Sequence, residues 1–351
     1  WKDWIDRRFM KTFYSLPEMQ VEEPNSLVGE FESKMFCGGC GSKVSADTLS
    51  EVLNKVMGNK APKGDAAVIE IPEGKVLLQS VDHFRSFLND PYTQARIALC
   101  HAMSDVYACG GNPVSVLANI TLPFSKPEIS QDYLSQLVHG ILYQLEKDNA
   151  ELIGGHTSEG EELSIGFTVN GLAEPNRLRE KKVIEPGLAI VLTKQLGVGA
   201  IFAADMQHKS KAEWVHEAIK SMLVSNRFAS ELATAFGVRS CTDITGFGLA
   251  GHLLEMIGPE VGVEIDLDKI PCLPGSLEVI NGLKIRSSLH DANKKVSKLG
   301  VLQEKSEILF DPQTSGGLVL AVEKSRALEM ISSLHQWGYY HAAIIGESIP
   351  E

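Results

Sequence analysis

The sequence predicts a mixed α/β (α+β) protein with two domains. Helical and extended patterns alternate along most of the chain after residue 34. The 351 residues, 44% of them hydrophobic, are enough for two domain-sized cores. A charged, turn-rich stretch, "NRLREKKVIEPG", interrupts the alternation in the middle of the chain. We therefore expect an N-terminal extension over residues 1–34, a first domain over 35–175 and a second domain over 176–351.

The N-terminal extension differs in pattern from the rest of the chain. The stretch "WKDWIDRRFMK" is typical of an amphipathic helix, and "SLPEMQVEEPNS" is typical of a linker. Because the chain begins with Trp1, we expect it to be a fragment, a processed form or part of a longer polypeptide. No catalytic residue is predicted in this extension.

The first domain carries alternating helix and strand signals. Apolar residues recur on one helical face from Leu49 to Met57. The β-rich runs "AAVIEI" and "KVLLQSV" lie on either side of "PEGK" and predict a hairpin. Asp90 followed by Pro91 predicts the start of a helix that continues to the glycine pair at 110–111. We then expect a strand "VSVLANITL", a helix over residues 129–149, and strands "ELIGG" and "LSIGFTVNGLAE" on either side of an acidic loop.

The second domain repeats the alternation. Its predicted order is a strand "LAIVLT", helices over residues 212–236, a strand near 240–244, a helix over 247–257 and a strand "GVEIDL". It closes with "SGGLVLAV", a helix from Lys324 and the strand "AAIIGESI".

Composition excludes several classes of protein. No apolar run is long enough to span a bilayer, and no secretory signal is present, so we expect no membrane span. Six cysteines in a chain of this length favour reduced thiols and a cytoplasmic location. The net charge of −12 argues against a nucleic-acid partner. If so acidic a protein binds a nucleotide, metal cations are expected between the two.

The motif "CGGCGSK" over residues 37–43 allows four interpretations. A zinc site needs two more ligands near the first pair. The other cysteines are scattered, at Cys100, Cys109, Cys241 and Cys272. A redox pair should open a helix after a strand, whereas this motif follows a linker. A plain glycine-rich loop stays open, beside a loop in which Lys43 lowers the pKa of the Cys40 thiol and meets a phosphate.

Three carboxylates stand at or inside the predicted elements of the first domain. Asp65 opens "DAAVIEI", and Asp82 closes "KVLLQSV". Asp105 lies on a predicted helical face whose other residues are small and apolar. Each alone could be a buried aspartate satisfied by a neighbouring loop. Together they indicate hard-cation binding, because Mg²⁺ prefers carboxylates combined with phosphate oxygens.

The stretch "TDITGFGLAGHLLEM" contains Gly246-x-Gly248-x-x-Gly251, which matches the dinucleotide fingerprint as text, with Asp266 at about the expected distance. That fingerprint requires an apolar strand before the first glycine, and Asp243 stands in the middle of that position. Dinucleotide binding is therefore disfavoured. A helix start without a ligand and a metal-ligating Asp243 both stay open.

Two further glycine-rich motifs follow strands or turns. In "IGGHTSEGEE" the paired glycines could offer backbone amides to phosphate, while His156 alone is more often structural. "FDPQTSGGLVLAV" predicts a structural turn into a buried strand.

Taken in order, these motifs resemble the selenophosphate synthetase (selenide, water dikinase) family from about residue 36 onward. The matching stretches are "CGSK", "GDAAV", "VDHF", "MSDVYACGGNP", "GGHT", "TDITGFGLAGHLLEM" and "DPQTSGG". The resemblance implies the two-domain aminoimidazole-ribonucleotide-synthetase-like (PurM-like) ATP-binding fold, with N-terminal sheets that pair into a homodimer. It also implies the reaction of ATP, selenide and water to selenophosphate, AMP and orthophosphate.

The resemblance assigns roles residue by residue. Cys40 and Lys43 match the catalytic pair, although the family's middle cysteine is Ser42 here. Asp65, Asp105 and Asp243 match ligands of two or more Mg²⁺ ions, and K⁺ is a further candidate cofactor. The ATP-contacting positions are Lys43, Pro62, Lys63, Gly64, Asp82, Asp105, Gly155, His156 and Thr157.

Two points complete the expectations. The N-terminal "WKDWIDRRFMK" is similar to the tail of NADH-dehydrogenase-like flavoproteins, which implies a fused or associated flavin oxidoreductase domain. The alternatives to a selenophosphate synthetase are another PurM-like ATP-dependent ligase or kinase, and a selenium-binding module without turnover.

Overall fold

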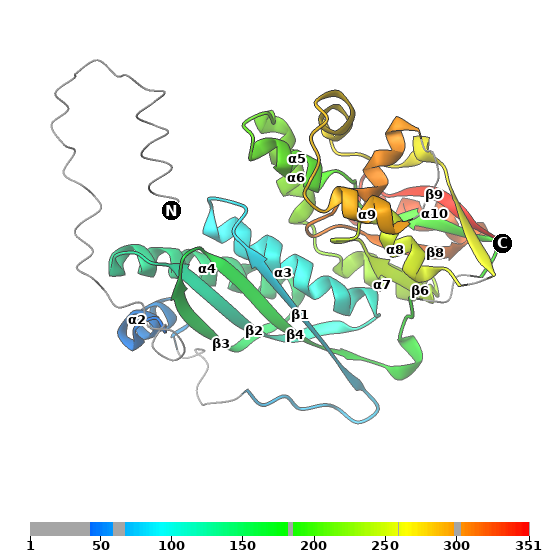
Figure 1. The fold of residues 1–351 in the computed structure, drawn as a ribbon. Helices are drawn as coiled ribbons and strands as arrows, with labels where there is room; N and C mark the ends of the chain where they lie inside the picture. The colour runs from blue at the N-terminus through cyan, green and yellow to red at the C-terminus, as the bar shows by residue number, and fades with distance from the viewer. Residues whose placement is uncertain (1–42, 59–66, 182–184, 259, 298–302, 351) are drawn as a thin grey trace, which may run out of the picture. The chain divides into compact units, whose positions relative to one another are not determined.

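The computed structural model describes residues 43–58, 67–181, 185–258, 260–297 and 303–350 (Figure 1). These residues form two β-sheets, of four and five strands, together with helices. The first sheet ends at Ala173 and the second begins at Leu188. Within the described ranges, none of the helices combines the length and the apolar character that crossing a membrane requires.

The first sheet has the strand order β1-β4-β2-β3. Its strands are β1 (Val76–Arg85), β2 (Asn112–Pro123), β3 (Glu151–Gly160) and β4 (Ser164–Ala173). Only β2 and β3 run parallel, whereas β4 pairs antiparallel with both β1 and β2. The helices of this part are α2 (Ala46–Met57), α3 (Pro91–Ala108) and α4 (Pro127–Asp148). Helices α3 and α4 pack on one face of the sheet, and α2 contacts α4 (Figure 1).

The second sheet is antiparallel throughout, with the order β6-β8-β5-β9-β7. Its strands are β5 (Leu188–Leu192), β6 (Ser240–Asp243), β7 (Val261–Ile265), β8 (Leu318–Glu323) and β9 (Ala343–Pro350). The helices are α5 (Val198–Asp205), α6 (Ala212–Met222), α7 (Arg227–Ala235), α8 (Gly248–Met256), α9 (His290–Ser297) and α10 (Lys324–Gln336). Short helical turns are η3 (Pro175–Arg177), η4 (Leu267–Lys269), η5 (Glu278–Gly282) and η6 (Glu304–Phe310).

The central strands of the second sheet are buried on both faces. On one face Ile190 and Leu192 pack in a core with α5, α6 and α8. On the other face Ala189 and Val191 pack with α7 and α10. This double burial explains the uninterrupted apolar run "LAIVL", because neither face needs a polar side chain.

Helix α3 confirms the prediction from its sequence signals. The side chain of Asp90 accepts a hydrogen bond from the Thr93 amide (3.2 Å), and Pro91 occupies the first turn. The helix then lies between the two sheets, in contact with β1 and β4 on one side and with β6, α6 and α7 on the other. Helix α3 therefore belongs to both layers of the structure.

Three local predictions are wrong. The described part of "AAVIEI", residues 67–71, forms no strand, and Val68 is 87% exposed. Within the described ranges β1 pairs only with β4, so residues 67–71 do not add a strand to the other edge of β1 as the hairpin prediction required. Strand β1 continues to Arg85, which places Asp82 inside the strand instead of at its end.

Strand β3 is the third correction. It continues through His156 to Gly160, because its parallel pairing with β2 extends to the register Pro123↔Gly160. The predicted acidic loop is therefore shortened to residues 161–163. Helices α5 and α9 were not predicted, and α5 is apolar on nearly all sides and so shows no helical periodicity.

Candidate active site

Strand β1 and helix α3 bring two predicted carboxylates together. Alternate residues of β1 point toward the helix layer, including Ser80, Asp82 and Phe84. The hydroxyl of Ser80 donates to Asp105 Oδ2 across 2.5 Å. Burial, and next the negative charge of Asp105, raise the pKa of Asp82 to about 6. The two carboxylates therefore repel each other in one partly buried site.

Asp243 joins this site from the second sheet. It is the last residue of β6 and is 3% exposed. Burial raises its pKa to about 7, with further contributions from the charges of Asp105 and Asp82, while a hydrogen bond from Ser104 and the charge of Lys181 act in the opposite direction. Strands β1 and β6 thus both pack against α3, and the carboxylates that they carry influence one another electrostatically.

One specific observation supports the binding of a hard cation at this site. Asp243 Oδ2 is buried and has no hydrogen-bond partner among the described residues. A buried, unpartnered carboxylate oxygen that also feels the negative charges of Asp105 and Asp82 is stabilised by a positive charge. Among the described residues, no three His, Cys, Asp or Glu side chains lie close enough together to hold a metal ion by themselves. Mg²⁺ does not need one, because it completes its coordination with phosphate oxygens and water.

The predicted residues near "GGHT" form a second group, on β3. Lys43 is exposed and forms a β-bridge with Ser158, and the Val44 amide donates to the Thr157 carbonyl (3.2 Å). Gly155 lies inside the strand, where a Cβ atom would stand 2.1 Å from the Ala118 carbonyl oxygen. The glycine is therefore required for the close approach of β3 to β2.

The two groups lie at opposite edges of the first sheet. Asp82 is on β1 and residues 155–157 are on β3, with β4 and β2 between them. Three strand spacings of about 4.8 Å separate these edges by roughly 14 Å. The remaining predicted residues lie outside the described ranges: Cys40, Pro62, Lys63, Gly64 and Asp65.

Several side chains at this site were not predicted. Ser80 could have been found from its position two residues before Asp82 on a strand, and His101 from its position one helical turn before Asp105. His101 Nδ1 accepts a hydrogen bond from the Ser315 amide (3.1 Å), and burial lowers the pKa of His101 to about 4. Its imidazole is therefore neutral, with the proton on Nε2. No local pattern indicates Ser315, because it is more than 200 residues away along the chain.

The "DPQTSGG" stretch is the turn that the sequence predicted, and it contacts several elements. Ser315 has a left-handed backbone (φ +50°), and its carbonyl accepts from the buried ammonium group of Lys194 (2.9 Å). A Cβ atom on Gly316 would stand 2.1 Å from the Ile244 carbonyl oxygen. The turn is therefore fitted closely against β6 and against helix α3.

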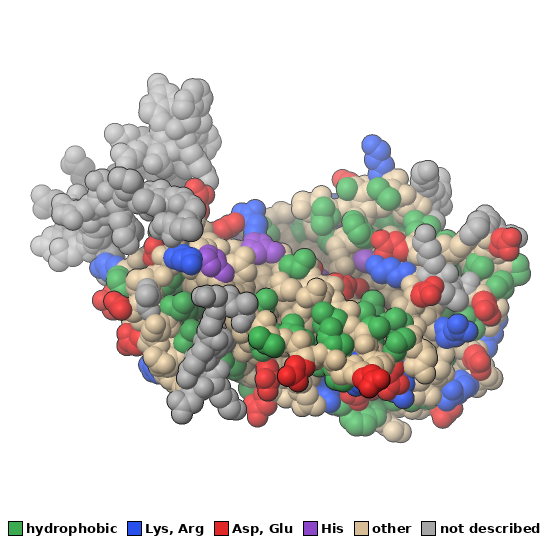
Figure 2. All heavy atoms as spheres, turned by 90° about the horizontal axis from the view of Figure 1, so that it is seen from below, with side chains coloured by type: hydrophobic (Ala, Val, Ile, Leu, Met, Phe, Trp, Pro, Cys, Tyr) green, Lys and Arg blue, Asp and Glu red, His purple; other side chains and the backbone are tan. Residues whose placement is uncertain are grey.

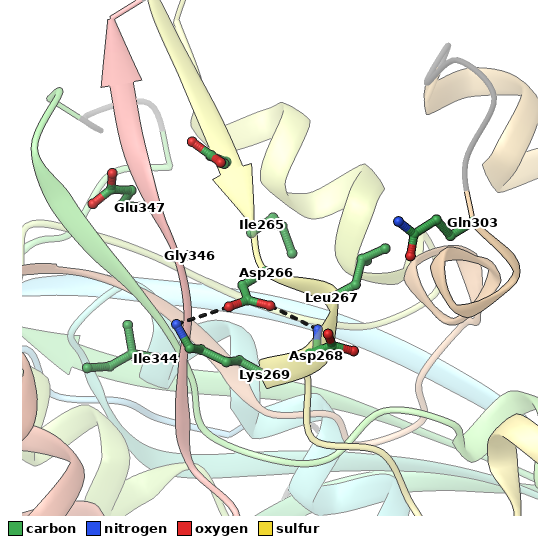
Figure 3. Close-up of a pocket in the computed structure, with 10 residues that line it drawn as sticks. Ile265, Asp266, Leu267, Asp268, Lys269, Gln303, Ile344, Gly346 and Glu347 are labelled. Atoms are coloured by element: carbon green, nitrogen blue, oxygen red, sulfur yellow. Dashed lines mark hydrogen bonds and ion pairs between the residues drawn. The ribbon is translucent and has the colours of Figure 1, made fainter.

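A cavity of about 560 Å³ lies elsewhere, between β7, β9 and η4 (Figure 3). Asp266, one of its acidic side chains, forms an ion pair with Lys269 (3.0 Å) and accepts from the Asp268 amide (3.0 Å). None of the predicted site residues lines this cavity. Its size alone assigns it no function.

Family models match both halves of the chain. The N-terminal domain of AIR synthase related proteins matches residues 63–173, and the C-terminal domain of the same group matches residues 185–351. The protein therefore has the two-domain AIR-synthase-related (PurM-like) fold.

Sequence relatives narrow the class to one family. Selenide, water dikinase from Clostridioides difficile (strain 630) is 31% identical over 329 residues, which cover 90% of this chain and 94% of the relative. Selenide, water dikinase from Pelobacter propionicus is 33% identical over 333 residues, which cover 89% and 93%. The chain belongs to the selenide, water dikinase family.

Solved structures agree on the fold. The hydrogenase maturation protein HypE in complex with ATP has a TM-score of 0.69 at 17% identity and covers 88% of each chain. Thiamine-monophosphate kinase from Stenotrophomonas maltophilia K279a has a TM-score of 0.64 at 16% identity, covering 88% of this chain and 95% of the kinase. At these identities the similarity shows the fold alone.

Proposed function

We propose that this chain catalyses the ATP-dependent synthesis of selenophosphate from selenide and water, with release of AMP and orthophosphate. One observation carries the proposal beyond family membership. Three carboxylates, Asp82, Asp105 and Asp243, interact electrostatically although they come from β1, α3 and β6. Such a group of carboxylates suits a nucleotide triphosphate bound through metal ions.

The carboxylates divide into two proposed roles. Asp105 and Asp243, with Asp65, would hold two or more Mg²⁺ ions, and Asp82 and Asp105 would contact the nucleotide. When bound, Mg²⁺ would neutralise the negative charge that develops on the transferred phosphoryl group. Ser80 keeps the Asp105 carboxylate oriented through their hydrogen bond.

Cys40 and Lys43 are the proposed catalytic pair. An exposed ammonium group at Lys43 can reach an anionic ligand, and it would stabilise the γ-phosphoryl group. Cys40 would handle selenium close to that group. Pro62, Lys63 and Gly64, together with Gly155, His156 and Thr157, would complete the ATP site.

We propose a homodimer that forms through the open face of the first sheet. On that face of β1, Gln79, Val81, His83 and Arg85 are exposed, and Val81 is 72% exposed. Figure 2 shows hydrophobic side chains among polar ones on the side of the molecule seen from below. Val68 and Ile71, also exposed, add apolar surface before β1. Exposed apolar residues on such a face favour pairing with a second copy.

Location and further partners complete the proposal. Cys100, Cys109, Cys241 and Cys272 are free thiols, which supports a reducing, cytoplasmic environment. K⁺ is proposed as an additional cofactor, and a flavin oxidoreductase domain as a fused or associated partner, on the family resemblance alone.

The decisive experiment measures nucleotide products with and without selenide. The full chain is incubated anaerobically with ATP and Mg²⁺, and phosphorus NMR follows AMP, orthophosphate and selenophosphate. We expect AMP and selenophosphate to form in equal amounts only when selenide is present. Consumption of ATP at the same rate without selenide would contradict the proposed function and favour another PurM-like ATP-dependent enzyme.

A further inference from the structure

We propose that His101 and Lys194 are positioning residues that hold the turn over residues 315–317 and thereby fix the position of Asp105 relative to Asp243. The turn belongs to the "DPQTSGG" stretch, to which the proposed reaction assigns no role. The two positioning roles rest on the proposed metal binding by the two aspartates.

One side of the turn is bound to the strand that carries Asp243. The amide of Ile244, the next residue, donates to the Gly317 carbonyl (2.9 Å). Within the sheet, Asp243 is the register partner of Leu318, the residue after the turn. At Gly316 the backbone approaches the end of β6 so closely that a Cβ atom would stand 2.1 Å from the Ile244 carbonyl oxygen. A shift of the turn would therefore shift Asp243 as well.

The other side of the turn is bound to α3, the helix that carries Asp105. The Ser315 amide donates to His101 Nδ1 (3.1 Å), and His101 lies one helical turn before Asp105. The imidazole also makes a T-shaped contact with the Phe84 ring of β1, with 4.8 Å between the ring centroids. The imidazole is thus held from two sides, which keeps Nδ1 directed at the turn.

A second hydrogen-bonded connection supports the first. Asn226, the residue before α7, is 1% exposed, and its Nδ2 donates to the Gly316 carbonyl (2.9 Å) and to Ser104 Oγ on α3 (2.8 Å). Consecutive residues of the turn are therefore connected to one stretch of α3, immediately before Asp105. A buried polar network of this kind is rigid when its members are satisfied.

Lys194 holds the turn from within the second domain. It is 5% exposed, and its Nζ donates to the carbonyls of Ser315 (2.9 Å) and Val224 (2.5 Å). Both acceptors are neutral, and burial of an ammonium group beside neutral groups costs free energy. Ser315 has an unfavourable left-handed backbone (φ +50°), which the ammonium group stabilises through the carbonyl. Lys194 therefore keeps Ser315 in the conformation that presents its amide to His101.

The position of the turn matters because the two aspartates come from different elements. Asp105 lies on α3 and Asp243 ends β6, so their relative position is set by packing between segments far apart in the chain. Functional side chains must be held within about 0.5 Å of the productive geometry. A turn that is hydrogen-bonded to both elements supplies this precision.

The test measures Mn²⁺ binding to the full chain, from the electron paramagnetic resonance signal of the free ion, with and without a non-hydrolysable ATP analogue. Mn²⁺ takes the same oxygen ligands as Mg²⁺. Loss of binding in Asp243→Asn assigns the counted ion to this site. We expect His101→Ala to weaken Mn²⁺ binding about tenfold, as loss of an outer partner does in metal sites. His101→Asn should restore most of the affinity, because the asparagine oxygen can accept in place of Nδ1.

Lys194→Met gives a second test, in which charge and positioning predict opposite effects. The positive charge of Lys194 interacts with the charge of Asp243, so its removal would by itself tighten the binding of a cation. Loss of the hydrogen bonds to the two carbonyls releases the turn and weakens binding. We expect the second effect to dominate, with Mn²⁺ binding about tenfold weaker.

The control is His335→Ala. His335 is a half-buried histidine of α10 whose Nε2 donates to the Ala342 carbonyl (3.0 Å). Like His101→Ala, this variant loses an imidazole and one hydrogen bond to the backbone, but it leaves the turn untouched. Its Mn²⁺ affinity should therefore match that of the unaltered chain. Circular dichroism and thermal unfolding establish which variants fold, and the two His101 variants decide if Lys194→Met does not.

Either of two results would overturn the positioning roles. One is folded His101→Ala that binds Mn²⁺ as tightly as the unaltered chain, and the other is folded Lys194→Met that binds it equally or more tightly. The proposed reaction is judged separately, by the selenide dependence of AMP release. Weaker Mn²⁺ binding in both variants, without selenide-dependent AMP from the unaltered chain, would keep the positioning roles and reject the reaction. Selenide-dependent AMP with unchanged Mn²⁺ binding in both variants would do the reverse.

Discussion

The hydroxyl of Ser80 donates to the carboxylate of Asp105 across 2.5 Å, between an edge strand and the helix that lies between both sheets. This bond joins two elements that each carry a predicted carboxylate, Asp82 on β1 and Asp105 on α3. It orients Asp105 without neutralising it, because a neutral hydroxyl adds no charge. The repulsion between the two aspartates therefore persists until a cation binds.

Ser80→Ala tests the importance of this orientation. A hydrogen bond to a charged group contributes about 1.5–3 kcal/mol, so we expect kcat/KM for ATP to fall about tenfold or more. The matched control is Ser332→Ala, because Ser332 is an exposed-face serine of α10 whose hydroxyl donates to a backbone carbonyl of its own helix (3.0 Å). If kcat/KM for ATP of Ser80→Ala is unchanged at limiting Mg²⁺, Ser80 has no role in orienting Asp105 for the reaction.

Lys43→Ala should abolish selenophosphate formation. The exposed ammonium group is the proposed partner of the transferred phosphoryl group, and alanine leaves that charge unbalanced. The measurement is the phosphorus NMR assay, with Lys295→Ala as a control because Lys295 is an exposed lysine on α9. Normal product from Lys43→Ala would show that another cation serves the phosphate.

Val81→Asp should convert the proposed homodimer into monomers. Val81 is 72% exposed on the open face of the first sheet, and a charge buried there without a partner opposes association. Light scattering coupled to size-exclusion chromatography gives the mass directly. Leu328→Asp, on the exposed side of α10, is the control for an added charge at an exposed apolar position. Equal masses for the Val81 and Leu328 variants would place any dimer contact elsewhere.

Asp311 should make the stability of the protein depend on pH. Burial raises its pKa from 3.8 to about 7, although Gln313 donates to its Oδ2 (2.9 Å) and the amides of Gly199 and Ala200 favour the charged form. The folded state then holds a proton that the unfolded state releases between pH 4 and 7. The free energy of unfolding should therefore fall as pH rises through this range, by an amount on the order of a few kcal/mol.

Thermal unfolding of Asp311→Asn against pH measures this contribution. Asparagine does not titrate, so the slope between pH 4 and 7 should become shallower than in the unaltered chain. Asp205→Asn, at an exposed position at the end of α5, should leave the slope unchanged. The assignment fails if both variants retain the original slope.

The sequence predicted the fold class because its elements carry their own signals. Asp90 and Pro91 mark the start of α3, and the apolar run at "LAIVL" marks a strand that is buried on both faces. The failures have tertiary causes. "AAVIEI" has strand propensity but no pairing partner within the described residues, and β3 continues through polar residues because β2 supplies its hydrogen bonds.

By itself, the sequence determined which side chains carry charge and which elements hold them, because charge and periodicity are local properties. It therefore named Asp82, Asp105 and Asp243 as candidate residues. Only the tertiary structure decided that these three interact, since β1, α3 and β6 meet through packing between residues far apart in the chain. The same is true of His101 and Ser315, whose hydrogen bond spans 214 positions and has no local signature.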